Sequence, residues 1–171
     1  MKLLFLFFIG GTFALSACGQ QDKSKRPSPP ALVKETISSG ATISIDYSQP
    51  SVKGRTIGKD LEPTTGKVWR TGANEATVFE TDKDVKVEGK ALPAGKYGLF
   101  SIMNADGTWT IIFNKTWKQW GAYSYKEADD ALRVTVQGAK GEFAEKLTFS
   151  IDKSGKVSFH WGDHLVSFLV Q

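Results

Sequence analysis

Residues 42–47 read Thr-Ile-Ser-Ile-Asp-Tyr, an alternation that places Ile43, Ile45 and Tyr47 on one face of an extended chain. Turn residues separate most of the strand-like segments, and only residues 125–130 have the pattern of a helical turn. About ten short strands at this spacing favour an all-β fold, an antiparallel β-sandwich of the jelly-roll kind. The other strand candidates are residues 67–70, 75–81, 84–88, 96–103, 108–114, 132–137, 146–151, 156–161 and 165–170.

The composition is that of an ordinary folded domain, with 40% hydrophobic and 12% aromatic residues in a chain of 171. This length allows one domain and leaves little room for two. A single Cys excludes an internal disulfide and a Cys-rich zinc site. Only two His residues argue against a His-rich metal site as well. We expect neither a metal nor a cofactor.

The first residues have the pattern of a secretory signal. A basic start is followed by an apolar run over residues 3–17, which is shorter than the roughly 18–20 residues that span a bilayer. The run ends in Leu-Ser-Ala-Cys at residues 15–18, which resembles a bacterial lipobox. In that resemblance residues 1–17 are removed and Cys18 carries a diacylglycerol, so that acyl chains anchor the protein stably to a membrane. The alternative is a plain signal peptide with an incidental Cys, although the chain's one Cys lies at this position.

The residues after Cys18 indicate in which membrane the predicted lipoprotein is anchored. Gly19 follows it, whereas an Asp there would indicate retention in the inner membrane of many Gram-negative bacteria. The dense acidic run of some surface-exported lipoproteins is also missing from the sequence. We therefore expect an outer membrane lipoprotein on the periplasmic face.

Residues 19–35, GQQDKSKRPSPPALVKE, hold three of the six prolines and few apolar residues. With Cys18 they form a predicted flexible tether, residues 18–35, that would hold a single domain, residues 36–171, roughly 20–25 Å from the anchor. The predicted domain has 17 basic and 16 acidic residues. It therefore lacks the basic excess of a nucleic-acid-binding domain, and we expect no nucleic acid partner.

Several longer motifs resemble a known family. They are Tyr-Ser-Gln-Pro at 47–50, Trp-Arg-Thr-Gly-Ala-Asn-Glu at 69–75, Leu-Pro-Ala-Gly-Lys-Tyr-Gly-Leu-Phe at 92–100 and Trp-Thr-Ile-Ile-Phe-Asn-Lys at 109–115. Together they resemble the bacterial domain-of-unknown-function family twenty-nine eleven, which is frequent among Bacteroidetes secreted proteins and lipoproteins. The resemblance implies an architecture and a compartment, and it implies no activity.

The segment 69–77 carries the densest set of polar groups. Arg70 is a planar bidentate donor, Asn74 donates and accepts, Glu75 accepts, and Trp69 offers a stacking face. Such a set is able to bind a sugar or a carboxylated small molecule. The alternative is a structural network, in which Arg70 pairs with Glu75 and Asn74 adopts a left-handed turn conformation.

Two other loops are candidates for binding. Arg55 lies in a basic loop whose two glycines allow backbone N–H groups to approach an anion, with a solvated loop as the alternative. An aromatic patch around Gly121, comprising Trp117, Trp120, Tyr123 and Tyr125, is of the kind that stacks on sugars. Its alternative is a minor core under a long loop.

The two histidines flank Gly162-Asp163, which has the composition of a two-residue hairpin turn. Such a turn would point His160 and His164 to opposite faces of the sheet, against shared metal binding. We expect each to be a surface or packing residue.

Three functions fit these features. The first is a non-catalytic, lipid-anchored module that binds a glycan, a peptide, a small molecule or an envelope protein. The second is a hydrolase of envelope or dietary polysaccharide with Glu75 as acid or base, although no motif supplies its second carboxyl group. The third is a structural or assembly module of the outer membrane.

Overall fold

The computed structural model describes residues 22–171, so the predicted signal peptide and Cys18 lie outside the described residues. The described chain is all-β, with two 3-10 turns, Lys23–Lys25 and Glu127–Asp129, as its helical elements, which confirms the predicted class. None of its helices is long and apolar enough to span a membrane. Its strands are β1 (Pro30–Thr36), β2 (Thr42–Ser48), β3 (Val78–Thr81), β4 (Val85–Val87), β5 (Lys90–Leu92), β6 (Gly95–Met103), β7 (Thr108–Asn114), β8 (Asp130–Ile151) and β9 (Lys156–Leu169).

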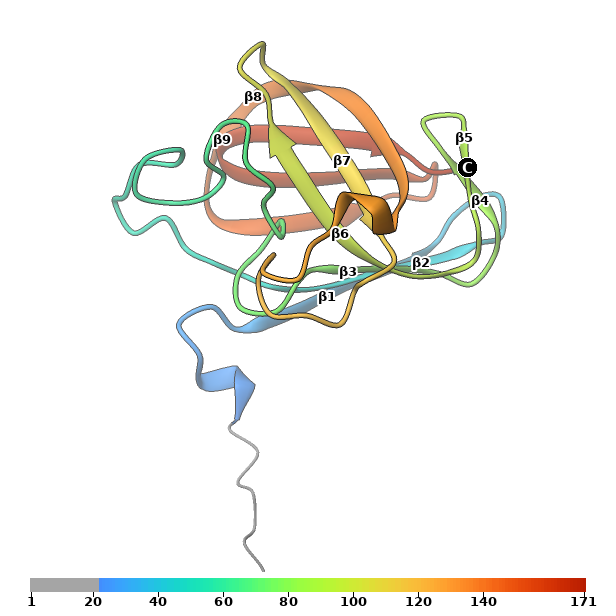
Figure 1. The fold of residues 1–171 in the computed structure, drawn as a ribbon, viewed down its shortest axis with the longest axis horizontal. Helices are drawn as coiled ribbons and strands as arrows, with labels where there is room; N and C mark the ends of the chain where they lie inside the picture. Colours follow the sequence, from blue (N-terminus) through green and yellow to red (C-terminus); the bar gives the residue numbers. More distant parts are fainter. Residues whose placement is uncertain (1–21) are drawn as a thin grey trace, which may run out of the picture.

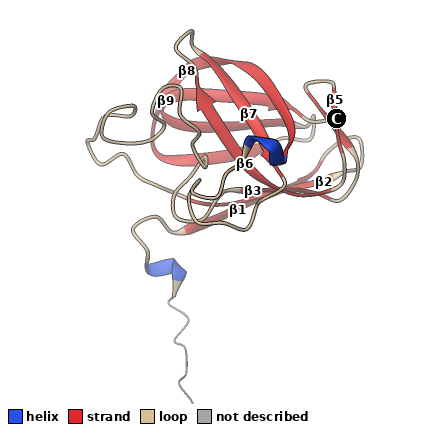
Figure 2. Cartoon of the chain, in the orientation of Figure 1, coloured by secondary structure: helices blue, strands red, loops and turns tan. Residues whose placement is uncertain are grey.

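Seven strands form one antiparallel sheet in the order β1-β2-β3-β6-β7-β8-β9, and β4 and β5 form a separate hairpin. Sheet neighbours follow one another along the chain, as in a meander. The sheet curls on itself, because the first part of β8 pairs with β7 while residues 138–151 pair with β9 (Figures 1 and 2). The chain just after β2 meets β8 again, where Val52 donates to the Glu145 carbonyl at 2.8 Å. The result is sandwich-like.

Aromatic side chains fill the space inside the curl. The alternation of residues 42–47 places one face of the strand in the core as predicted, since Ile43, Ile45 and Tyr47 are all buried. Ring pairs such as Trp109–Phe159, with centroids 5.5 Å apart, pack edge to face. Such pairs add to the large apolar area that each ring removes from water.

In two places where the sequence predicts a pair of short strands, the structure has one long strand. Strand β8 runs for 22 residues and β9 for 14, because bulges let each continue past its predicted end. The hairpin turn predicted at Gly162-Asp163 is therefore wrong: Gly162 has a φ of 58° and lies within β9, opposite Ala144. His164 packs against the Trp109 ring with centroids 5.6 Å apart.

The predicted tether also ends too late. Residues 30–35 belong to β1, which pairs with β2 over its full length. Ala31 and Val33 pack against the core, while Pro30 occupies the first position of an edge strand, where a missing N–H is tolerated. The domain therefore begins before Thr36.

Candidate functional site

The segment from Trp69 to Thr77 passes along the edge of β6, and its first residue is part of the core. The backbone N–H and carbonyl of Trp69 bond those of Ser101 at 2.8 and 2.9 Å. The Trp69 side chain is 2% exposed, and its Nε1 donates to the Gly72 carbonyl at 3.1 Å. The expected stacking face is therefore turned into the core, and Trp69 contributes packing.

The backbone of this segment is strained and firmly held. Thr71 has a φ of 49°, a left-handed conformation that a β-branched residue rarely adopts. Buried hydroxyl groups hold it there: Thr71 Oγ1 lies 2.9 Å from Ser101 Oγ, and Thr77 Oγ1 donates to the Thr71 carbonyl at 2.8 Å. A Cβ at Gly72 would lie 2.7 Å from Thr77 Oγ1, so the turn accepts only glycine without a shift. This frame fixes the direction in which Arg70 leaves the backbone.

Arg70 is half-buried and lies between two hollows. One, of about 370 Å³, is also lined by Arg55 and Asn74, and the other, of about 210 Å³, by Tyr123. Among the described residues, its Nε is a buried donor without a hydrogen-bond partner. Burial lowers the pKa of Arg70, and nearby Tyr123 and Glu62 oppose the shift. Because a guanidinium stays charged in proteins, the hollow contains a cation that lacks a full set of partners.

The other charged groups of the larger hollow are committed to their own loop. Arg55 donates to the carbonyl oxygens of Ser51 at 2.7 Å and Val52 at 3.1 Å. The carboxylates of Asp60 and Glu62 accept backbone N–H bonds within the loop, at 3.1 and 2.7 Å. Across residues 22–171 no carboxylate oxygen lies within 4.0 Å of the guanidinium nitrogens of Arg70 or Arg55.

Glu75 belongs to a different surface. It is bound by Arg26 Nη1, at 2.8 and 3.0 Å to its two oxygens, and by Lys23 Nζ at 3.0 Å. The Arg70–Glu75 pair that the structural alternative expected is therefore not formed. Burial alone would raise the pKa of Glu75, but hydrogen bonds from its own backbone N–H, Lys23 and Arg26 lower it to about 2.

The predicted aromatic patch divides into exposed and packed members. Tyr125 packs on Phe100 with ring centroids 5.1 Å apart, in a small second core, as the alternative interpretation expected. Trp120 is 54% exposed and Tyr123 is 88% exposed. The guanidinium of Arg26 lies 5.8 Å from the centre of the Trp120 ring.

Of the candidate residues, the structure therefore brings Arg55, Trp69, Arg70 and Asn74 to one hollow and places Tyr123 beside it. Glu75 and Trp120 line another hollow. The described chain contains no cluster of three or more potential metal ligands.

Sequence reasoning missed the part played by the N-terminal segment. Asn74 has the expected left-handed conformation, with a φ of 58°, but its amide donates to the Ser28 carbonyl at 3.0 Å. Lys23 and Arg26 bind Glu75, as described above. The sequence signal for this role was the cluster of basic residues in the predicted tether. No local pattern indicated that these residues pair with Glu75, about 50 residues further along the chain.

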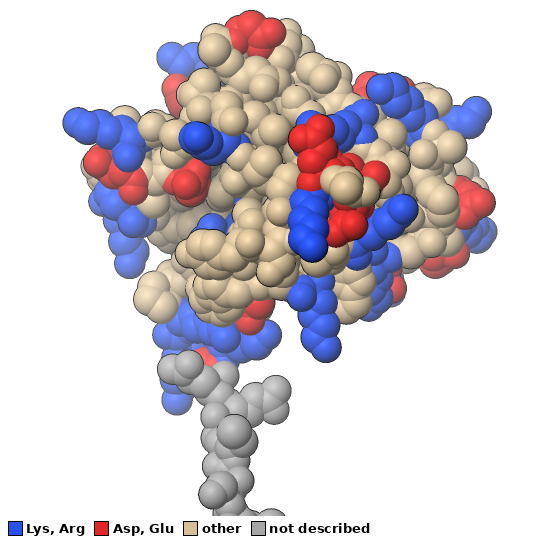
Figure 3. Space-filling model, viewed as in Figure 1, with Lys and Arg blue, Asp and Glu red and all other residues tan. Residues whose placement is uncertain are grey.

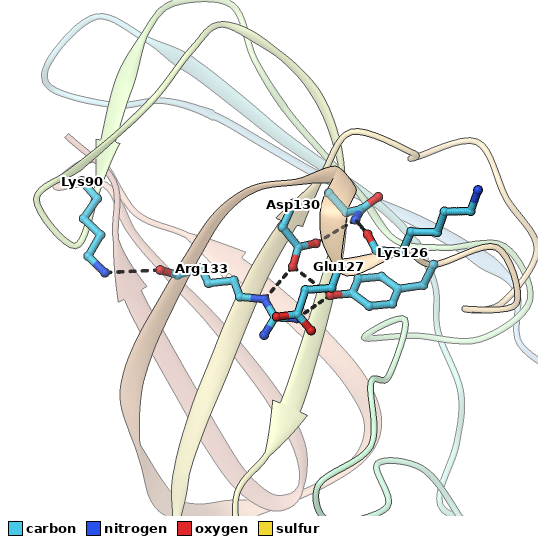
Figure 4. Close-up of polar contacts among 7 residues, drawn as sticks. Lys90, Lys126, Glu127, Asp130 and Arg133 are labelled. Carbon is cyan, nitrogen blue, oxygen red and sulfur yellow. Dashed lines mark hydrogen bonds and ion pairs between the residues drawn. The ribbon is translucent and has the colours of Figure 1, made fainter.

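A second half-buried arginine, Arg133, has partners at both its Nε and its Nη2 (Figure 4). Its Nε donates to Asp130 Oδ2 at 2.5 Å, and its Nη2 donates to the Tyr125 hydroxyl at 2.6 Å and lies 3.3 Å from Glu127 Oε2. Asp130 also accepts from Asn114 Nδ2 at 2.7 Å and from the Tyr125 hydroxyl at 2.8 Å. Burial raises the pKa of Tyr125 to about 12. The hydrogen bond to Asp130 adds to this shift, and Arg133 opposes it. This network holds the start of β8 to the loop before it.

Fold and site together define an all-β, sandwich-like domain with a guanidinium-lined hollow on a strained turn. The chain belongs to the family described as Protein of unknown function (DUF2911), whose model matches residues 28–170. This confirms the resemblance found in the sequence, and the match begins two residues before β1. No curated protein and no solved structure shows significant similarity to the chain.

Proposed function

We propose that the protein is a lipid-anchored component of the cell envelope whose domain binds, without catalysis, a ligand that carries a carboxylate. The observation that supports this most strongly is the Arg70 guanidinium, half-buried beside a hollow of about 370 Å³ with an unpartnered Nε. Removing a charged donor from water without pairing it is costly, and natural proteins pair such groups. Nε itself is buried, so a bound carboxylate would accept from the two terminal nitrogens, which donate as a fork and are not among the buried atoms.

The frame around Arg70 supports binding rather than a purely structural role. The backbone strain at Thr71 is of the kind that collects at functional sites. Because hydroxyl bonds to Ser101 and from Thr77 already hold the turn, little ordering would be needed when a ligand binds. The volume of the hollow lies in the range of small-molecule sites.

The hydrolase hypothesis finds no support at Glu75. A carboxyl group with a pKa of about 2 is ionised at neutral pH, so it holds no proton to give to a leaving group. Its oxygens are also engaged by Lys23 and Arg26. A weak base tied by two cations is equally unsuited to activating water.

The anchor is part of the same proposal. It is supported by the apolar run and the Leu-Ser-Ala-Cys sequence at residues 15–18, and the residues that would form it lie outside the described chain. Mass spectrometry of the protein from its native membrane tests it: the expected product starts at Cys18 and carries diacylglycerol. A chain that retains residues 1–17, or a mature end without lipid, would contradict the anchor.

The binding proposal is tested by isothermal titration of the purified protein with D-galacturonate, D-glucuronate and N-acetylated amino acids, each beside its neutral analogue. We expect at least one carboxylate to bind and its neutral analogue to bind at least about tenfold more weakly, the size of one charged hydrogen bond. Arg70→Met and Arg70→Lys should both lose binding, because Lys keeps the charge but lacks the fork of donors. Lys153→Gln, at an exposed turn, is the matched control.

Full binding by both Arg70 variants, or no carboxylate binding by the wild-type protein, would overturn the proposal.

A further inference from the structure

The N-terminal segment before β1 is fastened to the domain. Arg26 and Lys23 both bind Glu75, and the Ser28 carbonyl accepts from Asn74. The Arg26 guanidinium also lies over the Trp120 ring. The free tether is therefore much shorter than the 17 residues that the sequence indicates.

This attachment sets how far the domain is able to stand from a membrane. If Cys18 carries the lipid, only residues 19–21 separate the anchor from Asp22, the first described residue. Four residue steps span at most about 14 Å, even when fully extended. The surface around Asp22 must then lie close to the lipid headgroups.

That surface has the composition of a membrane interface. Trp120, which lies under the Arg26 guanidinium, is 54% exposed, and Tyr123 in the same loop is 88% exposed. Lys25, which precedes Arg26, and Lys118, in the loop that carries Trp120, are also exposed. Figure 3 shows basic side chains gathered where the described chain begins, below an uncharged bulge of the domain. We call Lys25, Lys118, Trp120 and Tyr123 the anchor-side surface.

Three carboxylates lie near this surface, and one of them, the exposed Asp46, forms no ion pair among the described residues. Glu75 is neutralised by Arg26 and Lys23, and Asp22 accepts from the backbone and hydroxyl of Ser24 at 3.0 and 2.7 Å and lies 4.0 Å from Lys25 Nζ. The four cations Lys23, Lys25, Arg26 and Lys118 still outnumber the three carboxylates. A hollow of about 320 Å³ opens beside Trp120 and is also lined by Val78 and Trp117. Exposed Trp and Tyr favour the headgroup level of a bilayer, and basic side chains are drawn to anionic phospholipid.

We infer that the anchor-side surface rests on the headgroups of an anionic phospholipid bilayer, with Trp120 and Tyr123 inserted at the interface. This rests on the anchor at Cys18 that is part of the proposed function. Because Tyr123 also lines the smaller hollow beside Arg70, the Arg70 site then lies near the headgroups. This contact gives the domain a fixed orientation, in which the β6–β7 turn points away from the membrane, at the opposite end of the molecule from the N-terminal segment (Figure 1).

The test reconstitutes the lipidated protein in vesicles of phosphatidylcholine and phosphatidylglycerol that include phosphatidylcholine brominated near the headgroup, and measures quenching of tryptophan fluorescence. Three of the five tryptophans are buried in the core, which leaves Trp120 as the most exposed reporter. We expect strong quenching in the wild-type protein and loss of most of it in Trp120→Phe. A matched variant, Trp120→Phe with Ala105→Trp, moves the exposed tryptophan to the β6–β7 turn and should show no recovery.

Quenching that is equal for tryptophan at position 120 and at position 105 would overturn the inference. If mass spectrometry finds no lipid on the chain, sedimentation with the same vesicles decides instead, and a protein that stays in solution overturns the inference as well. Failure of the ligand proposal is separate, since it appears as absent carboxylate binding while the quenching pattern is retained.

Discussion

Two half-buried arginines of this domain differ in how their charge is satisfied. Arg133 donates to Asp130 and Tyr125 and pairs with Glu127, as Figure 4 shows. Arg70 has a buried Nε with no partner among the residues that the structure describes, and it lies beside an open hollow. The same side chain therefore has two roles: Arg133 fastens one part of the fold to another, and Arg70 is poised for a group that comes from outside.

The comparison teaches that an arginine at a turn is informative only together with its partners. A guanidinium that is paired with carboxylates contributes to stability through its hydrogen bonds, whereas one with a buried, unpaired donor costs free energy. The two arginines should therefore respond in opposite ways to substitution, which the following predictions test.

The largest loss of stability is expected when the hydrogen-bond network of Arg133 and Asp130 is broken. Asp130→Ala removes the acceptor shared by Arg133, Tyr125 and Asn114, and leaves Arg133 Nε and the Tyr125 O–H without an acceptor. We expect the free energy of unfolding to fall by about 3 kcal/mol, a size typical of losing hydrogen bonds to a charged group. Urea denaturation measures it, with Asp163→Ala, at an exposed ion pair, as the control. Carboxylate binding at Arg70 should remain.

A somewhat smaller loss is expected in the frame of the Arg70 site. Gly72→Ala places a Cβ 2.7 Å from Thr77 Oγ1 and 3.2 Å from the Ser48 carbonyl. We expect a loss of about 2 kcal/mol in the free energy of unfolding, as for other overpacked sites, together with weaker carboxylate binding. Denaturation and titration calorimetry on the same variant measure both. Unchanged affinity despite lower stability would show that the turn does not position Arg70.

The contrast between Arg133 and Arg70 is tested by replacing each of them with methionine. Arg133→Met should lower the free energy of unfolding by about 2 kcal/mol, because Asp130 is left buried without its charged donor. Arg70→Met should leave it unchanged or raise it by up to about 1 kcal/mol, because an unpaired buried donor is removed. Only Arg70→Met should abolish carboxylate binding. Equal destabilisation by the two variants would remove the distinction on which the binding proposal depends.

The smallest effect is expected when acid protonates Glu75 and weakens its ion pairs with the N-terminal segment. The pKa of Glu75 is lowered to about 2 from an ordinary value of 4.5, so its ion pairs stabilise the folded arrangement fully above pH 4.5. That contribution should fall as the pH decreases from 4.5 towards 2, and residues 23–28 should then detach. Hydrogen exchange of these backbone amides measures the change. In Glu75→Gln, protection of these amides should be low at every pH in this range; protection like that of the wild type would contradict the account.

Local pattern predicted much of the fold. Residues 42–47 and 108–114 form strands where expected, because strict alternation or a run of β-branched and aromatic residues decides a strand without distant partners. The length of β8 and β9 was not predictable in this way. Their bulges exist because of the register of each strand on the other, which no single segment encodes.

The site was predictable in part for the same reason. The composition of residues 69–75 indicated a polar turn, and Asn74 has the left-handed conformation that such turns require. The side to which each residue points was not evident: Trp69 faces the core, and Glu75 faces an N-terminal segment that the sequence identified as a free tether. These orientations depend on pairing with β6 and on ion pairs to distant residues.

The most direct test of the account is an NMR titration that follows the Nε–H signals of both arginines while a carboxylate such as D-galacturonate is added. The account predicts that the Arg70 Nε–H signal shifts with saturation as the ligand pairs with the terminal nitrogens of the same guanidinium, while the Arg133 signal, already bonded to Asp130, stays in place. An Arg70 signal that is protected without ligand and unmoved by every carboxylate tested would contradict it.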